Sequence, residues 1–134
     1  MTLKNNSVKN FERQLLIGRW IRNCHDEEGN PFVEQADFYL DGSFEFCFMT
    51  MSKDGMIKEQ VIELGDWGLV GDMHFTITKN EVIDEKLYAA DLSNEDNYHV
   101  YRVVNLNADS FEYQHIVSKE SFILKRVIDN IGHC

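Results

Sequence analysis

Apolar and polar residues alternate along most of the chain that follows the N-terminal segment. The clearest run is ADFYLDGSFEFCFMTM, where every second residue over 36–40 is apolar. Asp41 and Gly42 come next, a pair typical of tight hairpin turns. Phenylalanine then occupies every second position over 44–48. Because side chains on a strand point alternately to opposite faces, this predicted hairpin has one aromatic face that requires a core.

Similar alternating runs continue beyond this hairpin, separated by short turn sequences. The predicted turns are KDG at 53–55, GD at 71–72, and residues 107–110 and 118–120. Residues 79–96 show no clear period, and we predict that they are irregular. The further predicted strands are 57–64, interrupted at 65–66, then 67–70, 73–78, 98–106, 110–117 and 120–128.

The N-terminal segment has a helical spacing instead. Phe11 and Leu15 are placed i, i+4, which puts both on one face of a short helix over residues 10–16. Ser7 is a suitable N-cap, because its side-chain oxygen can accept a hydrogen bond from the backbone of the first turn. Gly18 ends or breaks this helix just before the alternation begins.

Short turns without crossover helices favour antiparallel strands that pair in sequential order. A sheet with one aromatic face tends to curl and close, because closure removes its exposed edges. With 134 residues and 43% hydrophobic content, residues 1–134 are expected to form one domain with a substantial core. The sequence predicts an all-β fold, a single up-and-down antiparallel β-barrel of about eight to nine strands with a short N-terminal helix. A two-sheet β-sandwich is the alternative.

Acidic residues outnumber basic ones by 23 to 13, which gives a formal net charge of -10. Phosphate backbones are bound by clusters of Lys and Arg, and the sequence contains no such run. We therefore expect no nucleic acid and no anionic membrane as a partner. A soluble, self-repelling surface is the simplest interpretation of the acidity.

The N-terminal residues lack the apolar core and cleavage site of a secretory signal, and no window approaches the ~20 apolar residues of a membrane span. Cys24, Cys47 and Cys134 are widely spaced and odd in number, so we expect reduced thiols, a cytoplasmic location and no membrane insertion. The histidines show no metal-binding spacing, and nucleotide-binding motifs are absent from the sequence. We expect no metal and no cofactor.

Three motifs in the chain resemble those of lipocalins and their calycin relatives. That family carries Gly-x-Trp at the start of its first strand, matched here by Gly18 and Trp20. It also carries an Arg near the last strand that lies against this Trp, and Arg126 in FILKRVI is in the matching place. A Thr-Asp-Tyr-x-x-Tyr motif is echoed by Tyr98 and Tyr101, although an Asn replaces the Asp at position 97.

The resemblance implies a lipocalin-like barrel in which Gly18, Trp20 and Arg126 are structural residues that close one end. Many lipocalins are longer, secreted and held by a disulfide, whereas this chain shows neither leader nor paired cysteines. It is therefore more similar to short bacterial lipocalin-like domains. An Arg over an indole ring is itself worth about 0.5–2 kcal/mol.

Alternation from Trp20 places Arg22 on the lumen side of the predicted barrel. The same reasoning turns Phe75 and Ile77 inward, with most phenylalanines packing the core. Polar groups among aromatic residues are typical of a small-molecule site. Paired structural groups, or side chains that a bulge turns outward, are nevertheless the favoured explanation for them. The candidate ligand-binding residues are Arg22, Phe46, Phe48, Tyr98, Arg102, Tyr113 and His115.

We favour non-catalytic binding of a small, mostly apolar molecule inside the barrel. A carboxylate of aromatic or fatty-acid type is the natural ligand if Arg22 or Arg102 faces the lumen. One alternative is a protein-interaction module whose barrel is filled by side chains, with a protein as partner. The other is a barrel isomerase or cyclase that uses His115 and Tyr113 for proton transfer. No residue is assigned a catalytic role.

Overall fold

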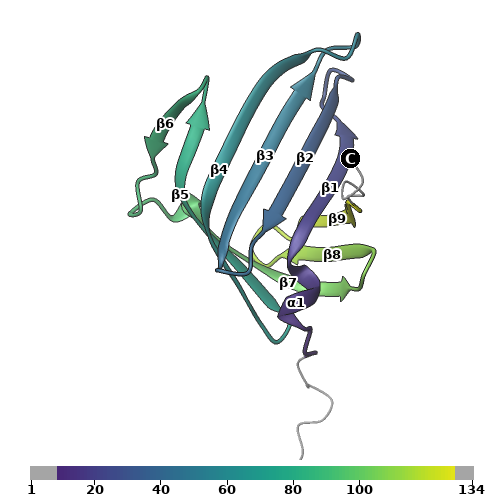
Figure 1. The fold of residues 1–134 in the computed structure, drawn as a ribbon, viewed down its shortest axis with the longest axis vertical. Helices are drawn as coiled ribbons and strands as arrows, with labels where there is room; N and C mark the ends of the chain where they lie inside the picture. Colours follow the sequence, from purple (N-terminus) through teal and green to yellow (C-terminus); the bar gives the residue numbers. More distant parts are fainter. Residues whose placement is uncertain (1–8, 129–134) are drawn as a thin grey trace, which may run out of the picture.

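Apart from β6, the strands pair with their neighbours in chain order, and the sheet closes on itself where the last strand meets the first (Figure 1). The computed structural model describes residues 9–128. One strand, β6, pairs only with β5 and lies outside the closed ring of eight. The elements are α1 Arg13–Leu16, β1 Gly18–His25, β2 Pro31–Phe38, β3 Ser43–Met51, β4 Ile57–Val70, β5 Met73–Ile83, β6 Lys86–Ala89, the short 3-10 helix η2 Glu95–Asn97, β7 Tyr98–Leu106, β8 Ser110–His115 and β9 Ser121–Arg126.

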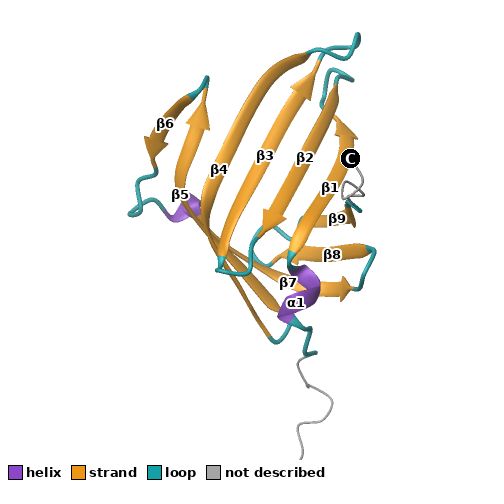
Figure 2. Ribbon diagram, viewed as in Figure 1, coloured by secondary structure: helices purple, strands orange, loops and turns teal. Residues whose placement is uncertain are grey.

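This arrangement confirms the predicted all-β, up-and-down barrel with a short N-terminal helix (Figure 2). The β4–β5 ladder and the β1–β9 ladder join what would otherwise be two separate sheets. The sandwich alternative is therefore wrong. All ladders are antiparallel, as short connections require.

The hydrophobic core fills the end of the barrel that α1 covers, at the bottom of Figure 1. Trp20 and Phe111 are fully buried there, with ring centroids 5.7 Å apart. The core comprises Leu16, Trp20, Ala36, Phe38, Phe44, Trp67, Val103, Leu106, Phe111 and Leu124. Side chains of these residues fill the interior of the barrel at this end.

The predicted turns at Gly42 and Gly71 are present, and both glycines have positive φ. Leu40 lies in the first of these turns and is exposed, because β2 ends at Phe38. Residues 57–70 form one continuous strand, with a register shift beside Gly65 in place of the predicted interruption. A Cβ on Gly65 would overlap the carbonyl oxygen of Ile77, so this close approach requires glycine.

The helix is shorter than predicted. It begins at Arg13, after an extended Glu12 that makes no side-chain cap, and not at residue 10. The backbone N–H of Phe11 donates to the carbonyl of Gly71 in the β4–β5 turn, at 3.2 Å. This contact holds residue 11 outside the helix, and the proposed cap Ser7 lies outside the described residues.

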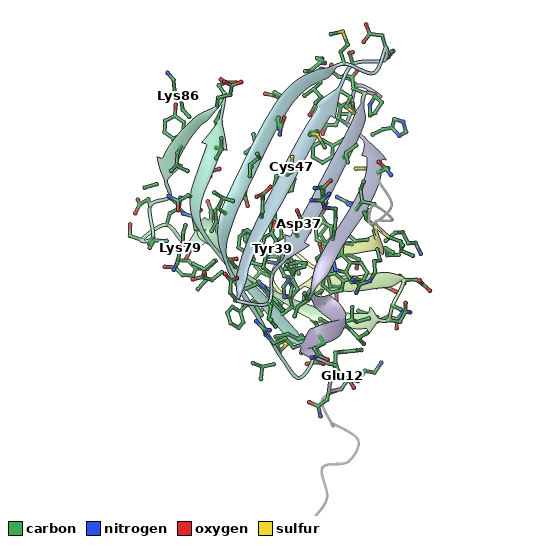
Figure 3. All side chains as sticks on the ribbon, in the orientation of Figure 1. Glu12, Asp37, Tyr39, Cys47, Lys79 and Lys86 are labelled. Atoms are coloured by element: carbon green, nitrogen blue, oxygen red, sulfur yellow. The ribbon has the colours of Figure 1, made fainter. Side chains whose placement is uncertain are left out.

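The prediction that residues 79–96 are irregular is wrong. They contain the end of β5, all of β6 and the first two residues of η2. Asp84 and Glu85 form the tight turn between the two strands, both with positive φ. Such turns usually carry Asn and Gly, so the sequence lacked the customary signal. Every residue of β6 is exposed, and Lys86 projects away from the barrel (Figure 3).

The inward face of β5 is the opposite of the one predicted. His74, Thr76 and Thr78 are buried, whereas Phe75 and Ile77 lie on the outer face. Phe75 packs its ring over Gly68 of β4, which has no side chain there to displace it. Outer apolar contacts of this kind make alternation ambiguous, because both faces of the strand then carry apolar groups.

Candidate functional site

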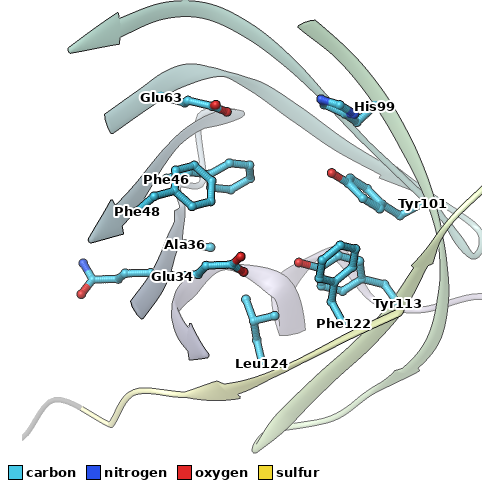
Figure 4. A pocket seen from close by; sticks show the side chains of 11 residues that line it. Glu34, Ala36, Phe46, Phe48, Glu63, His99, Tyr101, Tyr113, Phe122 and Leu124 are labelled. Atoms are coloured by element: carbon cyan, nitrogen blue, oxygen red, sulfur yellow. The ribbon is translucent and has the colours of Figure 1, made fainter. Parts of the chain in front are cut away.

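A partly open cavity of about 230 Å³ lies above the core, inside the barrel (Figure 4). Strands β2, β3, β4, β7, β8 and β9 all contribute to its wall. Most of the lining is aromatic, with a few polar groups among the rings. The lining residues are Glu34, Gln35, Ala36, Phe46, Phe48, Glu63, His99, Tyr101, Tyr113, Phe122 and Leu124.

Two aromatic walls face each other across the cavity (Figure 4). Phe46 and Phe48 form one wall, with ring centroids 6.3 Å apart on the same face of β3. Tyr101, Tyr113 and Phe122 form the other, where Tyr113 lies 5.0 Å from Tyr101 and stacks on Phe122 at 5.1 Å. These mutual contacts restrict the orientations of the rings in both walls.

The Arg22 side chain points into the barrel but is already engaged. Its guanidinium donates to both carboxylate oxygens of Glu34, at 3.0 and 2.7 Å. It also lies over the Phe122 ring, 5.0 Å from the centroid. The hydrogen bond from Arg22 to Glu34 is the main reason that the Arg22 pKa is raised. A bidentate pair of this kind leaves Arg22 charge-compensated within the protein.

The hydroxyls of Tyr101 and Tyr113 turn toward the cavity in Figure 4. Neither phenol has a hydrogen-bond partner within residues 9–128, although both rings contact several aromatic neighbours. Burial is the main cause that raises the pKa of both phenols, and the Glu63 carboxylate adds to the effect on Tyr101. Both tyrosines therefore stay protonated at neutral pH and can donate or accept a hydrogen bond.

Glu63 contributes a second carboxylate to the lining, from β4. Its Oε1 accepts a hydrogen bond from the Thr78 hydroxyl at 3.3 Å, and no cation of the described chain pairs with it. Glu81 is its register partner on β5. Burial, followed by the charge of Glu81, raises the pKa of Glu63. The carboxylate is thus held in a position that disfavours its own charge.

His99 of β7 lines the cavity and contacts a second histidine, His115 of β8. The Nδ1 of His99 and the Nε2 of His115 are 3.1 Å apart. The backbone N–H groups of Val117 and Ser118 donate to His115 Nδ1, so the proton of the neutral ring is on Nε2 and is donated to His99. Burial, followed by the neighbouring His115, lowers the pKa of His99.

A third histidine, His74, lies between the cavity and the core. It is 2% exposed and sits among Phe38, Tyr101 and Phe111, with ring centroids 5.2, 5.7 and 5.6 Å away. Its Nδ1 lies 3.1 Å from the Gly68 carbonyl oxygen, which can only accept, so Nδ1 carries the proton. Burial lowers the pKa of His74 to about 4.

Only part of the predicted site comes together. Phe46, Phe48 and Tyr113 line the cavity, and Arg22 lies behind Glu34. His115 does not line it and reaches it only through His99. Whether any of these residues binds a ligand stays a prediction.

Tyr98 and Arg102 were predicted to face the lumen, and this is wrong. Tyr98 is 45% exposed and donates its hydroxyl to the Leu92 carbonyl, 2.8 Å away. Arg102 is also exposed and pairs with Asp72 at 2.8 Å. The inward residues of β7 are instead His99, Tyr101 and Val103, since aromatic groups on both faces of this strand made the alternation ambiguous.

The three residues assigned to barrel closure lie together at the core end. The Arg126 guanidinium lies over the Trp20 ring, 4.2 Å from its centroid, and the two residues are register partners. It donates to the carbonyls of Ala108, Ile17 and Leu15. Gly18 has a φ of +129°, and a Cβ there would lie 2.5 Å from Arg126 Nη1.

Eight lining residues were not among the candidate ligand-binding residues: Glu34, Gln35, Ala36, Glu63, His99, Tyr101, Phe122 and Leu124. Glu34 shares the period of Ala36 and Phe38, so extending β2 toward its start would have placed it inside. Glu63 is an acidic residue within a run of apolar ones and pairs with Phe46. His99 and Tyr101 were missed because the wrong face of β7 was chosen.

Across residues 9–128, no group of His, Cys, Asp or Glu side chains is arranged to hold a metal ion. The described part of the chain also contains no helix with the length and apolar character needed to cross a membrane.

Comparison with known proteins identifies the fold. A lipocalin-like protein from Bacteroides uniformis ATCC 8492 is 19% identical, with 84% of this chain and 99% of that chain covered and a TM-score of 0.52. A de novo designed fluorescence-activating β-barrel is 13% identical, with 85% and 95% covered and a TM-score of 0.41. No protein-family model and no curated protein matches the chain. The chain has a lipocalin-like fold.

Proposed function

We propose that the protein binds a small, mostly apolar molecule in the cavity between the two aromatic walls, without chemical conversion. The observation that carries the proposal is the cavity itself, because rings on both sides leave about 230 Å³ unfilled above a well-packed core. Pockets for small ligands are typically apolar and aromatic, with a few polar groups that fix orientation. Tyr101 and Tyr113 supply such groups here.

The cavity is smaller than the roughly 300–1,000 Å³ of most ligand pockets. A compact ligand with one or two rings fits this space better than a long acyl chain. A ligand carboxylate also has weak support, since Arg22 is engaged by Glu34 and Arg102 lies outside the barrel. The ligand we propose is therefore small, flat and without a carboxylate anchor on arginine.

The alternatives have less support. The interaction alternative requires a barrel that is filled by its own side chains, whereas this barrel contains a cavity of about 230 Å³. An isomerase or cyclase that depends on His115 needs a free ring nitrogen, but both nitrogens of that ring already have partners. We therefore place binding ahead of interaction and catalysis.

Native mass spectrometry tests the proposal directly. The protein is purified gently from its own host cells and weighed under native and then denaturing conditions. We expect a reproducible excess mass that disappears on denaturation and identifies the class of ligand. No excess mass, together with no uptake of a small lipophilic dye, would overturn the proposal.

A filled-cavity variant locates the binding. Ala36→Leu extends a side chain into the cavity, whereas Ala89→Leu makes the same change on exposed β6. We expect Ala36→Leu to abolish the excess mass or dye uptake and Ala89→Leu to leave it unchanged. Equal binding by both variants would place the ligand elsewhere.

A further inference from the structure

We infer that the ligand of this cavity is an alkylamine that carries an aromatic ring, and that its positively charged nitrogen pairs with Glu63. The inference rests on the binding function proposed above and goes further by assigning the charge of the ligand. It follows from the distribution of charge around the cavity, from the unused hydroxyls and from the aromatic walls.

Among residues 9–128, the charged side chains that line the cavity are both carboxylates, Glu34 and Glu63. Glu34 is neutralised by the bidentate contact with Arg22. Glu63 has only the Thr78 hydroxyl as a partner, at 3.3 Å, and no ion pair among the described residues. The uncompensated charge that faces the cavity is therefore negative, and a cationic ligand matches it.

Glu81 makes the charge on Glu63 still more unfavourable. The two glutamates are directly opposite each other across the β4–β5 ladder, where like charges destabilise a sheet. An organic cation placed against Glu63 would offset both this repulsion and the cost of burying the carboxylate. The protein supplies no lysine or arginine for that purpose at this position within residues 9–128.

The remaining lining suits an ammonium group attached to a ring. Phe46 and Phe48 line the cavity, and the faces of aromatic rings attract cations and pack against flat apolar groups. The Tyr101 hydroxyl points inward between these walls in Figure 4, without a partner of its own, and can accept a hydrogen bond from an ammonium. An anionic ligand, in contrast, would meet two carboxylates and an arginine that is already paired.

Isothermal titration calorimetry with three small probes tests the charge assignment on the intact protein. The probes are 2-phenylethylamine, 2-phenylethanol and 3-phenylpropanoate, which share a ring and differ mainly in the charge of the end group. We expect the amine to bind at least tenfold more tightly than the alcohol, and the carboxylate to bind most weakly. Binding of the alcohol or the carboxylate as tight as that of the amine would overturn the inference while leaving the binding function intact.

Two matched variants assign the effect to Glu63. Glu63→Gln keeps the shape of the side chain and removes its charge, and Glu45→Gln does the same on the outer face of the neighbouring strand β3. We expect Glu63→Gln to reduce the preference for the amine over the alcohol to less than threefold. Glu45→Gln should keep the wild-type preference. Equal preferences in both variants would show that Glu63 is not the partner.

Failure of the inference can be separated from failure of the proposed function. If no probe binds and native mass spectrometry finds no excess mass, both the binding function and the inference about the charge of the ligand are wrong. If a bound molecule is found and carries no basic nitrogen, only the inference falls. The comparison of probes uses the wild-type protein, so it remains decisive even if Glu63→Gln folds poorly.

Discussion

Acid should destabilise this barrel through His74, the histidine enclosed between the cavity and the core. The ring is fully surrounded by aromatic side chains and by the Gly68 carbonyl, which accepts a hydrogen bond from Nδ1. Protonation would place a charge on Nε2, which has no carboxylate beside it. The folded protein therefore resists protonation that the unfolded chain accepts freely.

The size of the effect follows from the pKa of His74, which burial lowers from 6.5 to about 4. Below pH 6.5 the unfolded chain binds the proton while the folded chain does not, so stability falls as the pH falls. The whole difference corresponds to about 3 kcal/mol of unfolding free energy, of which about 2 kcal/mol is lost between pH 7 and pH 5. The loss ends once the pH falls below the folded pKa of about 4.

Urea denaturation at a series of pH values measures this loss. His99 titrates in the same direction, and carboxylates contribute too, so His74→Gln is compared with the wild type and with His25→Gln, which alters an exposed histidine. We expect His74→Gln to lose about 2 kcal/mol less than the wild type over that range. His25→Gln should follow the wild type.

A wild-type pH dependence that survives unchanged in His74→Gln would refute this reasoning. A separate check needs no variant, because an NMR titration of the wild type follows each imidazole. Signals of His74 should remain those of the neutral ring well below pH 6.5. Protonation near the ordinary histidine pKa would show that the ring is not enclosed as described.

Three substitutions test the closed end and the β5–β6 turn by urea denaturation. Gly18→Ala should lower the unfolding free energy by about 2–4 kcal/mol, because its φ of +129° strains any side chain and the new Cβ would displace Arg126. A loss below about 0.5 kcal/mol would contradict the contact between Gly18 and Arg126. Arg126→Met should cost about 2–3 kcal/mol, since it removes the guanidinium from over Trp20 and leaves carbonyls without a donor. Glu85→Gly should instead stabilise the protein by up to about 1 kcal/mol, because this residue has a φ of +64° and glycine adopts that conformation without strain. The same change at the neighbouring Asp84 should act in the same direction. Destabilisation by both variants would contradict the positive φ angles of this turn.

The barrel could be predicted because its strongest signals agree with one another. The hairpin at Asp41 and Gly42 combines a turn pair with an unbroken alternation of phenylalanines, and the fold places both as expected. Gly18, Trp20 and Arg126 gave a further, long-range constraint on how the chain closes. Agreement between local and distant signals is what makes a fold readable from its sequence.

The cavity was predicted less well, because a period of two does not say which face is inside. On β5 the apolar Phe75 and the polar His74 compete for the lumen, and the outcome depends on Gly68, a residue of another strand. On β7 the choice between Tyr98 and Tyr101 is equally balanced in the sequence. Only the register between strands resolves such cases, and register is a property of the assembled sheet.

The seam between β1 and β9 has a consequence for how the protein is made. Arg126 reaches back to the carbonyls of Ile17 and Leu15, which are 109 and 111 residues away along the chain. During synthesis one edge of β1 must stay unpaired until β9 has left the ribosome, while the strands between them can already pair in order. An exposed strand edge is a site for pairing with other chains. Nascent chains that stall before residue 126 should therefore be the species of this protein that most needs a chaperone.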